Sequence, residues 1–180
     1  LAEINGVPLV RFMIEALLSS NVTSITVVTG HEGEQVAAAL SEFTNLSFVH
    51  NPDYDAGLST SLKAGLRALP ETLDGVMICL GDMPLVTPVM VNELIEAFDP
   101  DEGRSICVPV YGRKRGNPIL WSKTYLRRMI SLSGDKGARP LLEEYNDQIF
   151  EVVMQNDGVL FDVDTPERLQ SLRGRLSSAG

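Results

Sequence analysis

The sequence predicts an α/β fold in which helices cover both faces of a mostly parallel sheet. Segments with helical and strand-like periodicity alternate along the 180 residues. Several strand-like segments are apolar throughout, as expected for strands that are buried on both faces. Hydrophobic residues make up 44% of the chain and charged residues 22%, which is typical of a globular protein with one full core. We therefore expect a single domain over residues 1–180.

The elements of the first half are recognised from their periodicity. Apolar positions recur at helical spacing behind Pro8, a residue suited to a helix start. β-branched, apolar runs that end at glycine or at a polar residue indicate strands. Ser59 and Thr60 are possible caps for the third helix. The expected elements are a helix over 8–20, a strand over 24–30, a helix over 32–43, a strand over 46–51, a helix over 59–69 and a strand over 75–81.

The second half continues the alternation. Its expected elements are a helix over 88–98, a strand over 104–110, an extended piece over 118–121, helices over 122–132 and 137–145, a strand over 147–153 and a helix over 165–176. Cys79 and Cys107 lie in strand-like runs and are interpreted as small core residues, not as a disulfide. The expected order of elements begins with a helix, whereas such domains usually open with a central strand and a Gly-rich turn. We therefore expect that this opening unit is absent from the sequence.

Composition narrows the possible functions. The net charge is −9 and the isoelectric point is near 4.7, so a nucleic-acid backbone is a poor partner. No apolar run approaches the 18 or so residues of a membrane span, and the first residues lack the features of a signal peptide. These patterns favour a cytoplasmic protein. Because the chain has no CxxC motif or His/Cys cluster, we do not expect a zinc site.

Polar residues follow several of the expected strands. In parallel α/β sheets, ligands bind at the carboxyl ends of the strands, and these ends form one rim. The segments expected on this rim are 29–31, Asn51, Gly81 with Asp82, and the loop 111–117.

Asp82 is the first candidate for a chemical role. It directly follows the apolar run 76–80 and precedes Pro84, so it could simply start a turn. Two further carboxylates, Asp162 and Asp164, are two residues apart and would share one side of an extended segment. They could equally cap the following helix. The alternative for all three is a magnesium site, since Mg²⁺ takes one or two carboxylates together with phosphate oxygens.

Three other segments carry weaker signals. The small-residue loop 56–61 enters a helix and suits a polar or anionic ligand, although an ordinary capped helix explains it as well. The cations of the 111–117 loop could steer a phosphate, although a solvated loop is the default interpretation. Further cations lie near the expected helix start at 137. The cations of these two segments are Arg113, Lys114, Arg115, Lys136 and Arg139.

Taken together, five segments resemble a known family. They read "NPDYDAGLSTSL", "GDMPLV", "RGNPILW", "GDKGARPLL" and "DVDTPERL", in this order across residues 51–169. In this order they are similar to the molybdenum cofactor cytidylyltransferase family, within the larger group of MobA-like nucleotidyltransferases. The resemblance implies a Rossmann-like, three-layer αβα sandwich of the nucleotide-diphospho-sugar transferase type.

The resemblance also implies an activity and a set of site residues. The activity is transfer of CMP from CTP to a terminal phosphate of a pterin cofactor, with release of pyrophosphate and with Mg²⁺ as the cofactor. Asp82 and Asp164 would be catalytic and, with Asp162 as the less certain partner, would hold the metal. The residues implied in nucleotide binding are Gly57, Ser59, Ser61 and Gly81. Those implied in acceptor binding are Gly116, Asn117, Pro118, Lys136 and Arg139.

The sequence departs from the family at its start. The family opens with a strand and a loop of the form LAAGxSxRMG, and Leu1 and Ala2 follow where that loop would end. Other readings therefore stay open: a transferase that uses GTP, ATP or another phosphate acceptor, or a non-catalytic chaperone that passes the cofactor to a molybdenum hydroxylase apoenzyme. The carboxylates Asp82, Asp162 and Asp164 favour an enzyme, because a pure binder has no need of a metal site.

Overall fold

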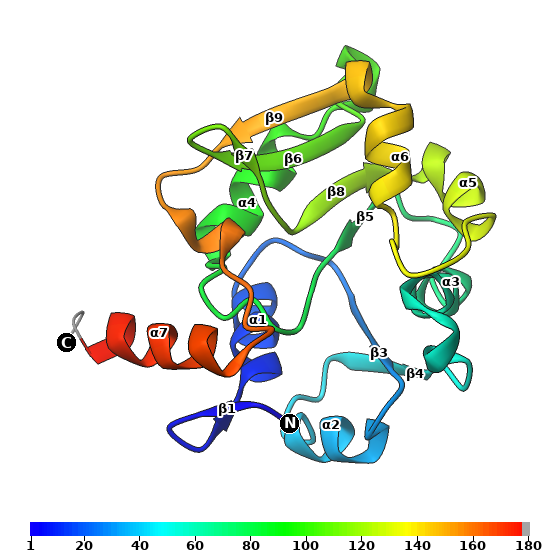
Figure 1. Cartoon of the computed structure of the whole chain (residues 1–180). Helices are drawn as coiled ribbons and strands as arrows, with labels where there is room; N and C mark the ends of the chain where they lie inside the picture. The colour runs from blue at the N-terminus through cyan, green and yellow to red at the C-terminus, as the bar shows by residue number, and fades with distance from the viewer. Residues whose placement is uncertain (178–180) are drawn as a thin grey trace.

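The computed structural model describes residues 1–177 and confirms the α/β class (Figure 1). Its helices are α1 (Leu9–Leu18), α2 (Gly33–Ala39), α3 (Leu58–Arg67), α4 (Pro88–Ala97), α5 (Leu126–Ile130), α6 (Arg139–Glu144) and α7 (Pro166–Ser177). Its strands are β1 (Glu3–Ile4), β2 (Val7–Pro8), β3 (Ile25–Thr29), β4 (Leu46–His50), β5 (Gly75–Ile78), β6 (Ile106–Tyr111), β7 (Lys114–Arg115), β8 (Ile119–Ser122) and β9 (Ile149–Val153).

The main sheet has five strands and mixed directions. β8 lies between β5 and β6 and is antiparallel to both, whereas β9 is parallel to β6. We expected a mostly parallel sheet. The difference arises because β6 and β8 are joined by only a short connection that contains β7, and a parallel crossover needs a dozen or more residues.

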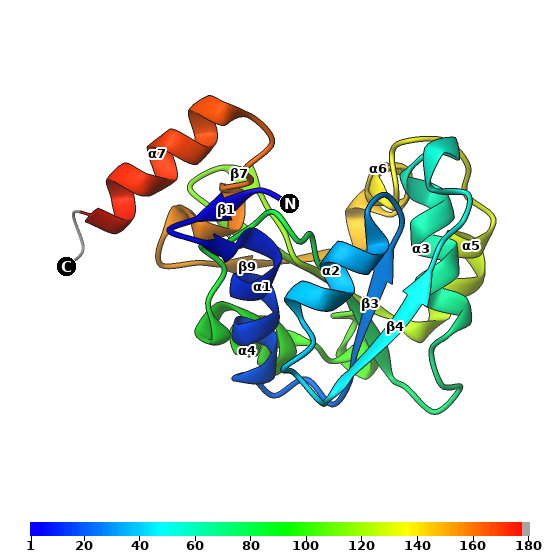
Figure 2. The ribbon, with the colours of Figure 1, turned by 90° about the horizontal axis from the view of Figure 1, so that it is seen from below.

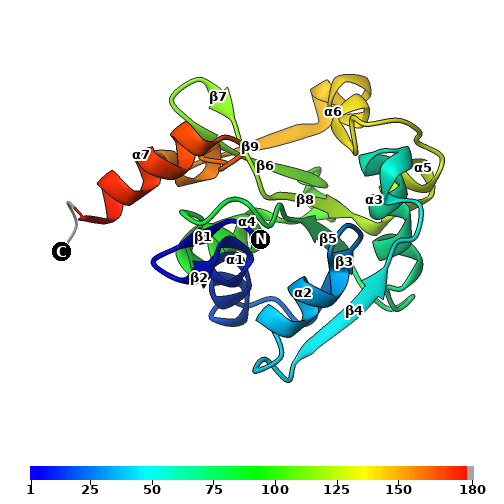
Figure 3. The same ribbon diagram turned by 60° about the horizontal axis from the view of Figure 1, so that its bottom comes forward.

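β3 and β4 form a separate, parallel pair (Figure 3). The sequence predicted a buried strand over residues 75–81, and the structure differs from this in two respects. The strand ends at Ile78, and β5 pairs with β8 on one side only, so it lies at an edge of the five-stranded sheet. All four residues of β5 are therefore only half-buried, despite their apolar character.

Helices cover both faces of the strands and form the outer layers. On one face α1, α2 and α4 pack against β3, β5 and β6, with Leu40, Val91 and Leu94 fully buried. On the other face α3, α5 and α6 pack around Trp121, Met129 and Leu141, none of which is exposed. This three-layer arrangement is the one implied by the alternating sequence pattern.

Several elements differ in detail from the sequence prediction. A β1–β2 hairpin precedes α1, and the helix expected over 122–132 is a 3₁₀ turn (Lys123–Tyr125) followed by α5. Helix α3 begins at Leu58 with Gly57 at its N-cap, so Ser59 and Thr60 lie inside the first turn and do not cap it. Both cysteines are free thiols, as expected. Within residues 1–177, none of the helices has the length and apolar character needed to cross a bilayer.

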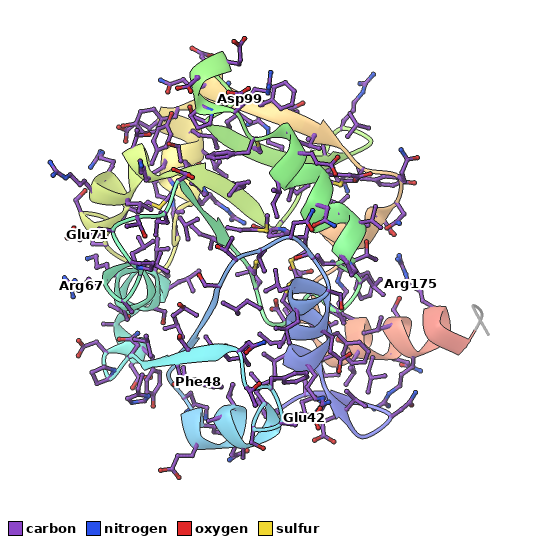
Figure 4. The ribbon with its side chains drawn as sticks, turned by 180° about the vertical axis from the view of Figure 1, so that it is seen from behind. Glu42, Phe48, Arg67, Glu71, Asp99 and Arg175 are labelled. Carbon is purple, nitrogen blue, oxygen red and sulfur yellow. The ribbon has the colours of Figure 1, made fainter. Side chains whose placement is uncertain are left out.

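The C-terminal helix α7 projects from the body of the molecule (Figure 2). Hydrogen bonds from an arginine near each end attach it to the preceding segment. Arg175, labelled in Figure 4, donates two hydrogen bonds to Asp157, at 2.9 and 2.8 Å. Arg168 donates to Asp162 at 2.8 Å. Both guanidinium groups also lie over the ring of Phe161, that of Arg168 at 4.8 Å from the ring centroid and that of Arg175 at 4.6 Å. These contacts hold α7 against the segment 157–162 that precedes it.

Removing the Asp157 carboxylate should lower stability in a pH-dependent way. The hydrogen bonds from Arg175 lower the pKa of Asp157, so its ionised form is favoured in the folded state. This contribution is present above the unfolded pKa, near 4, and is lost as the pH falls through the lower folded value. Because the pair is about two-fifths exposed, we expect Asp157→Asn to cost no more than about 1 kcal/mol at pH 7.

Thermal unfolding at pH 7 and pH 2, each at low and high salt, measures this effect. The difference between Asp157→Asn and the wild type should shrink at pH 2 and in high salt. Asp101→Asn, which removes a carboxylate with no ion pair in the described structure, is the control and should unfold like the wild type. A deficit that persists unchanged at pH 2 would show that the carboxylate charge is not its cause.

Candidate active site at the carboxyl ends of the strands

Asp82 lies just beyond the end of β5, on the expected rim. Its Oδ1 atom is buried and has no hydrogen-bond partner in the described structure. Burial raises the pKa of Asp82, and the nearby charges of Asp162 and Asp164 raise it further. An ionised carboxylate in such a place is costly unless a positive group approaches it. The position therefore has the character of a cation ligand more than of a solvated turn residue.

The structure brings Asp162 and Asp164 near Asp82, whose pKa both of their charges raise. The backbone N–H of Val163, which lies between them, donates a hydrogen bond of 2.9 Å to the carbonyl of Asp82. The two aspartates differ in availability. Asp162 accepts a hydrogen bond from Arg168, whereas Asp164 is exposed. Asp162 exerts the larger charge effect on Asp82 but is engaged by Arg168, so Asp164 is the carboxylate that is free to bind a cation together with Asp82.

These residues fit a magnesium ion that also binds phosphate. Within residues 1–177, no three His, Cys, Asp or Glu side chains come together as a closed metal cluster. Mg²⁺ does not need one, because it commonly binds one or two carboxylates and takes its other ligands from water and phosphate. The unpartnered Oδ1 of Asp82 is the observation that favours a cation here. Asp82 and Asp164 would hold it.

The loop before α3 has a conformation that requires glycine. Gly57 has φ 107° and ψ 164°, a region that L-residues rarely adopt. A Cβ atom at Gly57 would lie 2.2 Å from Oδ1 of Asp135 and 2.9 Å from the backbone of Gly134. Ser59 and Ser61 lie in the first turn of α3. Ser59 is buried and its N–H donates to the carbonyl of Gly134, whereas Ser61 is half-buried. The backbone conformation at Gly57 therefore sets where Ser59 and Ser61 lie at the start of α3.

Gly81 lies apart from that loop. It is exposed, directly precedes Asp82 and lies near Val10 of α1, whose side chain would be 3.4 Å from an added Cβ. Within the described part of the chain, no hydrogen bond joins the Gly57 loop to Asp82. The predicted nucleotide-binding residues thus fall into two groups, one after β4 and one after β5.

The predicted acceptor-binding residues also separate into two groups. Gly116, Asn117 and Pro118 pack against the segment before the carboxylates: the N–H of Asn117 donates to the carbonyl of Val159 at 2.9 Å. A Cβ at Gly116 would lie 2.2 Å from that same carbonyl oxygen, so glycine is required. At Gly158, the residue before Val159, an added Cβ would lie 2.4 Å from the carbonyl oxygen of Leu85. The 116–118 segment and Asp82 are therefore both fixed to residues 158–163.

Lys136 and Arg139 lie elsewhere, beside the Gly57 loop. The carbonyl of Gly134 accepts a hydrogen bond of 3.1 Å from the N–H of Ser59, and Gly137 lies close to Leu58. Both cations are exposed. This separation from residues 116–118 could not be predicted, because the contact between the 134–137 turn and α3 joins segments that are far apart along the chain.

The basic cluster of residues 113–115 is only partly available for a ligand. Arg115 donates to Glu151 and to Asn146, at 2.8 Å each, and is held across the sheet to β9. Arg113 and Lys114 lie exposed at the β6–β7 turn. Arg115 is therefore engaged by partners within the protein, whereas Arg113 and Lys114 remain on the solvated surface of the loop.

Sequence reasoning placed Asn51 on the rim but gave its side chain no role. The structure buries this carboxamide and gives it three hydrogen bonds, to Asp53, Thr60 and Ser61. A polar residue immediately after a strand was the only available signal, and it does not distinguish an exposed side chain from a buried one.

The Gly57 loop follows β4 and Asp82 follows β5, so both lie beyond the carboxyl ends of strands, where α/β proteins bind ligands. Comparison with known proteins defines the class more closely. Residues 1–149 match the family described as the MobA-like NTP transferase domain, and the chain belongs to this family. It is a nucleotidyltransferase.

Individual relatives agree with this assignment. The chain is 29% identical over 143 residues to the molybdenum cofactor cytidylyltransferase of Escherichia coli, which covers 79% of this chain and 70% of that protein. It is 33% identical over 91 residues to the bifunctional protein GlmU of Rubrobacter xylanophilus, covering 51% of this chain and only 19% of GlmU. A solved nucleotidyl transferase from Methanothermobacter thermautotroptrophicus superposes with a TM-score of 0.85 at 27% identity, over 100% of this chain and 85% of that one.

Proposed function

We propose that this nucleotidyltransferase transfers CMP from CTP to a molybdopterin-type cofactor and releases pyrophosphate, with Mg²⁺ as the metal. The unpartnered, half-buried carboxylate of Asp82 beside Asp162 and Asp164 carries the proposal. The nature of the acceptor and of the base is supported by the similarity to the cytidylyltransferase of Escherichia coli.

The reaction is a displacement at phosphorus. An oxygen of the acceptor's terminal phosphate attacks the α-phosphorus of CTP, and the bond to the bridging oxygen breaks, so that pyrophosphate leaves with the electron pair. The protein needs no covalent intermediate, because positioning and charge stabilisation supply most of the rate. When bound, Mg²⁺ would neutralise charge on the phosphate oxygens.

Different residues bind the metal, the nucleotide and the acceptor. Asp82 and Asp164 hold the metal, and the hydrogen bond between Asp162 and Arg168 keeps the 162–164 segment in place. Gly57, Ser59 and Ser61 bind the nucleoside part, where glycine allows the ligand to approach the backbone. Gly116, Asn117 and Pro118 lie beside the carboxylates and bind the acceptor. Lys136 and Arg139, beside the Gly57 loop, supply positive charge that attracts the substrate phosphates.

Pyrophosphate release tests the proposal. The complete protein is incubated with the pterin acceptor, Mg²⁺ and either CTP, GTP, ATP or UTP. We expect release with CTP above the other three, loss of activity on addition of a chelator, and recovery with excess Mg²⁺. A preference for GTP or ATP would retain the transferase and overturn the choice of base. Binding of the pterin without pyrophosphate release from any nucleotide would favour a non-catalytic carrier instead.

A further inference from the structure

Asn51 connects three segments of the candidate nucleotide site. It directly follows β4, and its backbone N–H donates to the carbonyl of Thr29 at the end of β3, at 2.7 Å. The residue is 3% exposed. The carboxamide Oδ1 accepts from the N–H of Asp53 at 3.1 Å, while Nδ2 donates to Thr60 at 2.8 Å and to Ser61 at 2.9 Å. One buried side chain thus joins the strand ends to the turn at 53 and to the first turn of α3.

These hydrogen bonds fix the direction of the two hydroxyl groups. Because both N–H groups of Nδ2 are donors, the hydroxyl oxygens of Thr60 and Ser61 act as acceptors toward Asn51. Thr60 has carbonyl acceptors for its own proton, at Gly57 (2.8 Å) and Asp53 (2.9 Å). Within the described structure, the hydroxyl proton of Ser61 has no such acceptor. It is therefore directed away from Asn51 and can be donated to a ligand.

The same loop is held from its other side. The N–H of Ser59 donates to the carbonyl of Gly134, and Gly57 lies against the backbone of the 134–135 turn. Because this second contact does not involve Asn51, loss of the carboxamide should loosen the loop without detaching it. The effect of a substitution at Asn51 can therefore be separated from unfolding.

We propose that Asn51 is a positioning residue for the nucleotide. It orients the Ser61 hydroxyl as a hydrogen-bond donor to the nucleoside part of the substrate. It also holds Thr60 in the position from which its hydroxyl donates to the carbonyl of Gly57. This inference rests on the proposed function. Asn51 itself contacts no reacting atom; it acts through the two hydroxyl groups. The chemical requirement on the ligand is an acceptor atom, such as a carbonyl oxygen or ring nitrogen of the base or a ribose oxygen.

Two substitutions at Asn51 and one control test this inference. Asn51→Asp keeps the shape and the acceptor for Asp53 but has no N–H donors, and Asn51→Ala removes both functions. The control, Asn92→Ala, removes the half-buried carboxamide on α4 that accepts from the N–H of Asn21. Binding of CTP with Mg²⁺ is measured by calorimetry, and KM and kcat are measured for CTP and for the acceptor separately.

We expect both Asn51 variants to bind CTP about tenfold more weakly, as for the loss of a hydrogen-bonding group in a binding site. Their KM for the acceptor should stay within about twofold of the wild type, because residues 116–118 do not depend on this loop. Asn92→Ala should match the wild type in every measurement. In addition, Ser61→Ala combined with Asn51→Asp should lose little more than either change alone, since both remove the same interaction.

The outcomes separate this inference from the proposed function. If the wild type binds CTP and both Asn51 variants bind it equally well, Asn51 is only a structural residue and the inference is overturned while the function stands. Additive losses in the Ser61→Ala, Asn51→Asp double variant would also overturn it. If the wild type binds none of the four nucleotides, the proposed function fails and this inference fails with it.

Discussion

Replacing Asp82 with asparagine should lower kcat by about a thousandfold or more while the protein remains folded. Asparagine keeps the size of the side chain but cannot bring negative charge to a cation, so the charge that develops on the transferring phosphate loses its support. Single groups that stabilise transition-state charge contribute about 10²–10³ in kcat, and a metal ligand is expected at or above the upper end of this range. Pyrophosphate release under saturating substrates measures the change.

Stability provides the internal control for this variant. Burial raises the pKa of Asp82, so the ionised carboxylate is disfavoured in the folded protein. For an acid with a raised folded pKa, stability falls as the pH rises from the unfolded value through the folded one. At pH 7 the neutral Asp82→Asn side chain should therefore unfold at the same temperature as the metal-free wild type or higher. Activity and stability would then change in opposite directions.

The neighbouring aspartates should respond unequally. Asp164→Asn is expected to lower kcat by a larger factor than Asp162→Asn, because Asp162 already accepts a hydrogen bond from Arg168. Asp147→Asn, on the far 3₁₀ turn at Asn146–Gln148, is the matched control and should retain wild-type kcat. Wild-type turnover in Asp82→Asn would remove Asp82 from the mechanism and leave its buried oxygen as a feature of folding alone.

Adding one methyl group at Gly57 should damage nucleotide binding more than any other single glycine-to-alanine change in the loop regions. At φ 107° and ψ 164° an alanine is strained, at a cost of about 1–3 kcal/mol. Its Cβ would also lie 2.2 Å from Oδ1 of Asp135 and 2.9 Å from the Gly134 backbone. The Gly57 loop and the 134–135 turn must then separate. We expect KM for CTP to rise about tenfold or more, with a smaller change in KM for the acceptor.

Gly103→Ala distinguishes backbone strain from steric conflict. Gly103 also has a positive φ, 79°, but an added Cβ would meet nothing within 4 Å. This control should lose some stability and keep its KM for CTP. Combining Gly57→Ala with Asp135→Gly removes the side-chain obstacle but leaves the backbone of Gly134, so binding should stay impaired. Full recovery in that double variant would show that the Asp135 carboxylate alone restricts the position.

The sequence predicted the order of helices and strands well, because their periodicity is a local property. β3, α4 and β9 all lie within the expected ranges. Pairing between strands is not local, and here the sequence prediction was less successful. An apolar run such as 76–80 indicates a strand, but nothing in it states whether one or both edges find a partner. The edge position of β5 and the antiparallel direction of β8 could be learned only from the tertiary structure.

In the candidate site, too, contacts between segments that are distant along the chain were harder to predict than local features. Asp82, Asp162 and Asp164 were grouped from the family resemblance, and the structure places the three carboxylates near one another. Lys136 was grouped with residues 116–118 from the family resemblance, yet the structure places it beside the Gly57 loop. The hydrogen bonds of Asn51 were missed because they depend on side-chain burial, which a single asparagine after a strand does not reveal.

The separation of β3–β4 from the five-stranded sheet has a consequence for ligand binding. The Gly57 loop follows β4 and Asp82 follows β5, so the two halves of the site belong to sheets that share no strand pairing in the described structure. Side-chain packing through α1 and α3 is what joins them. A nucleotide that contacts the loop with its base and the carboxylates through its phosphates would act as a cross-link between the sheets. Occupancy of the site would thereby stabilise the contact between these two sheets.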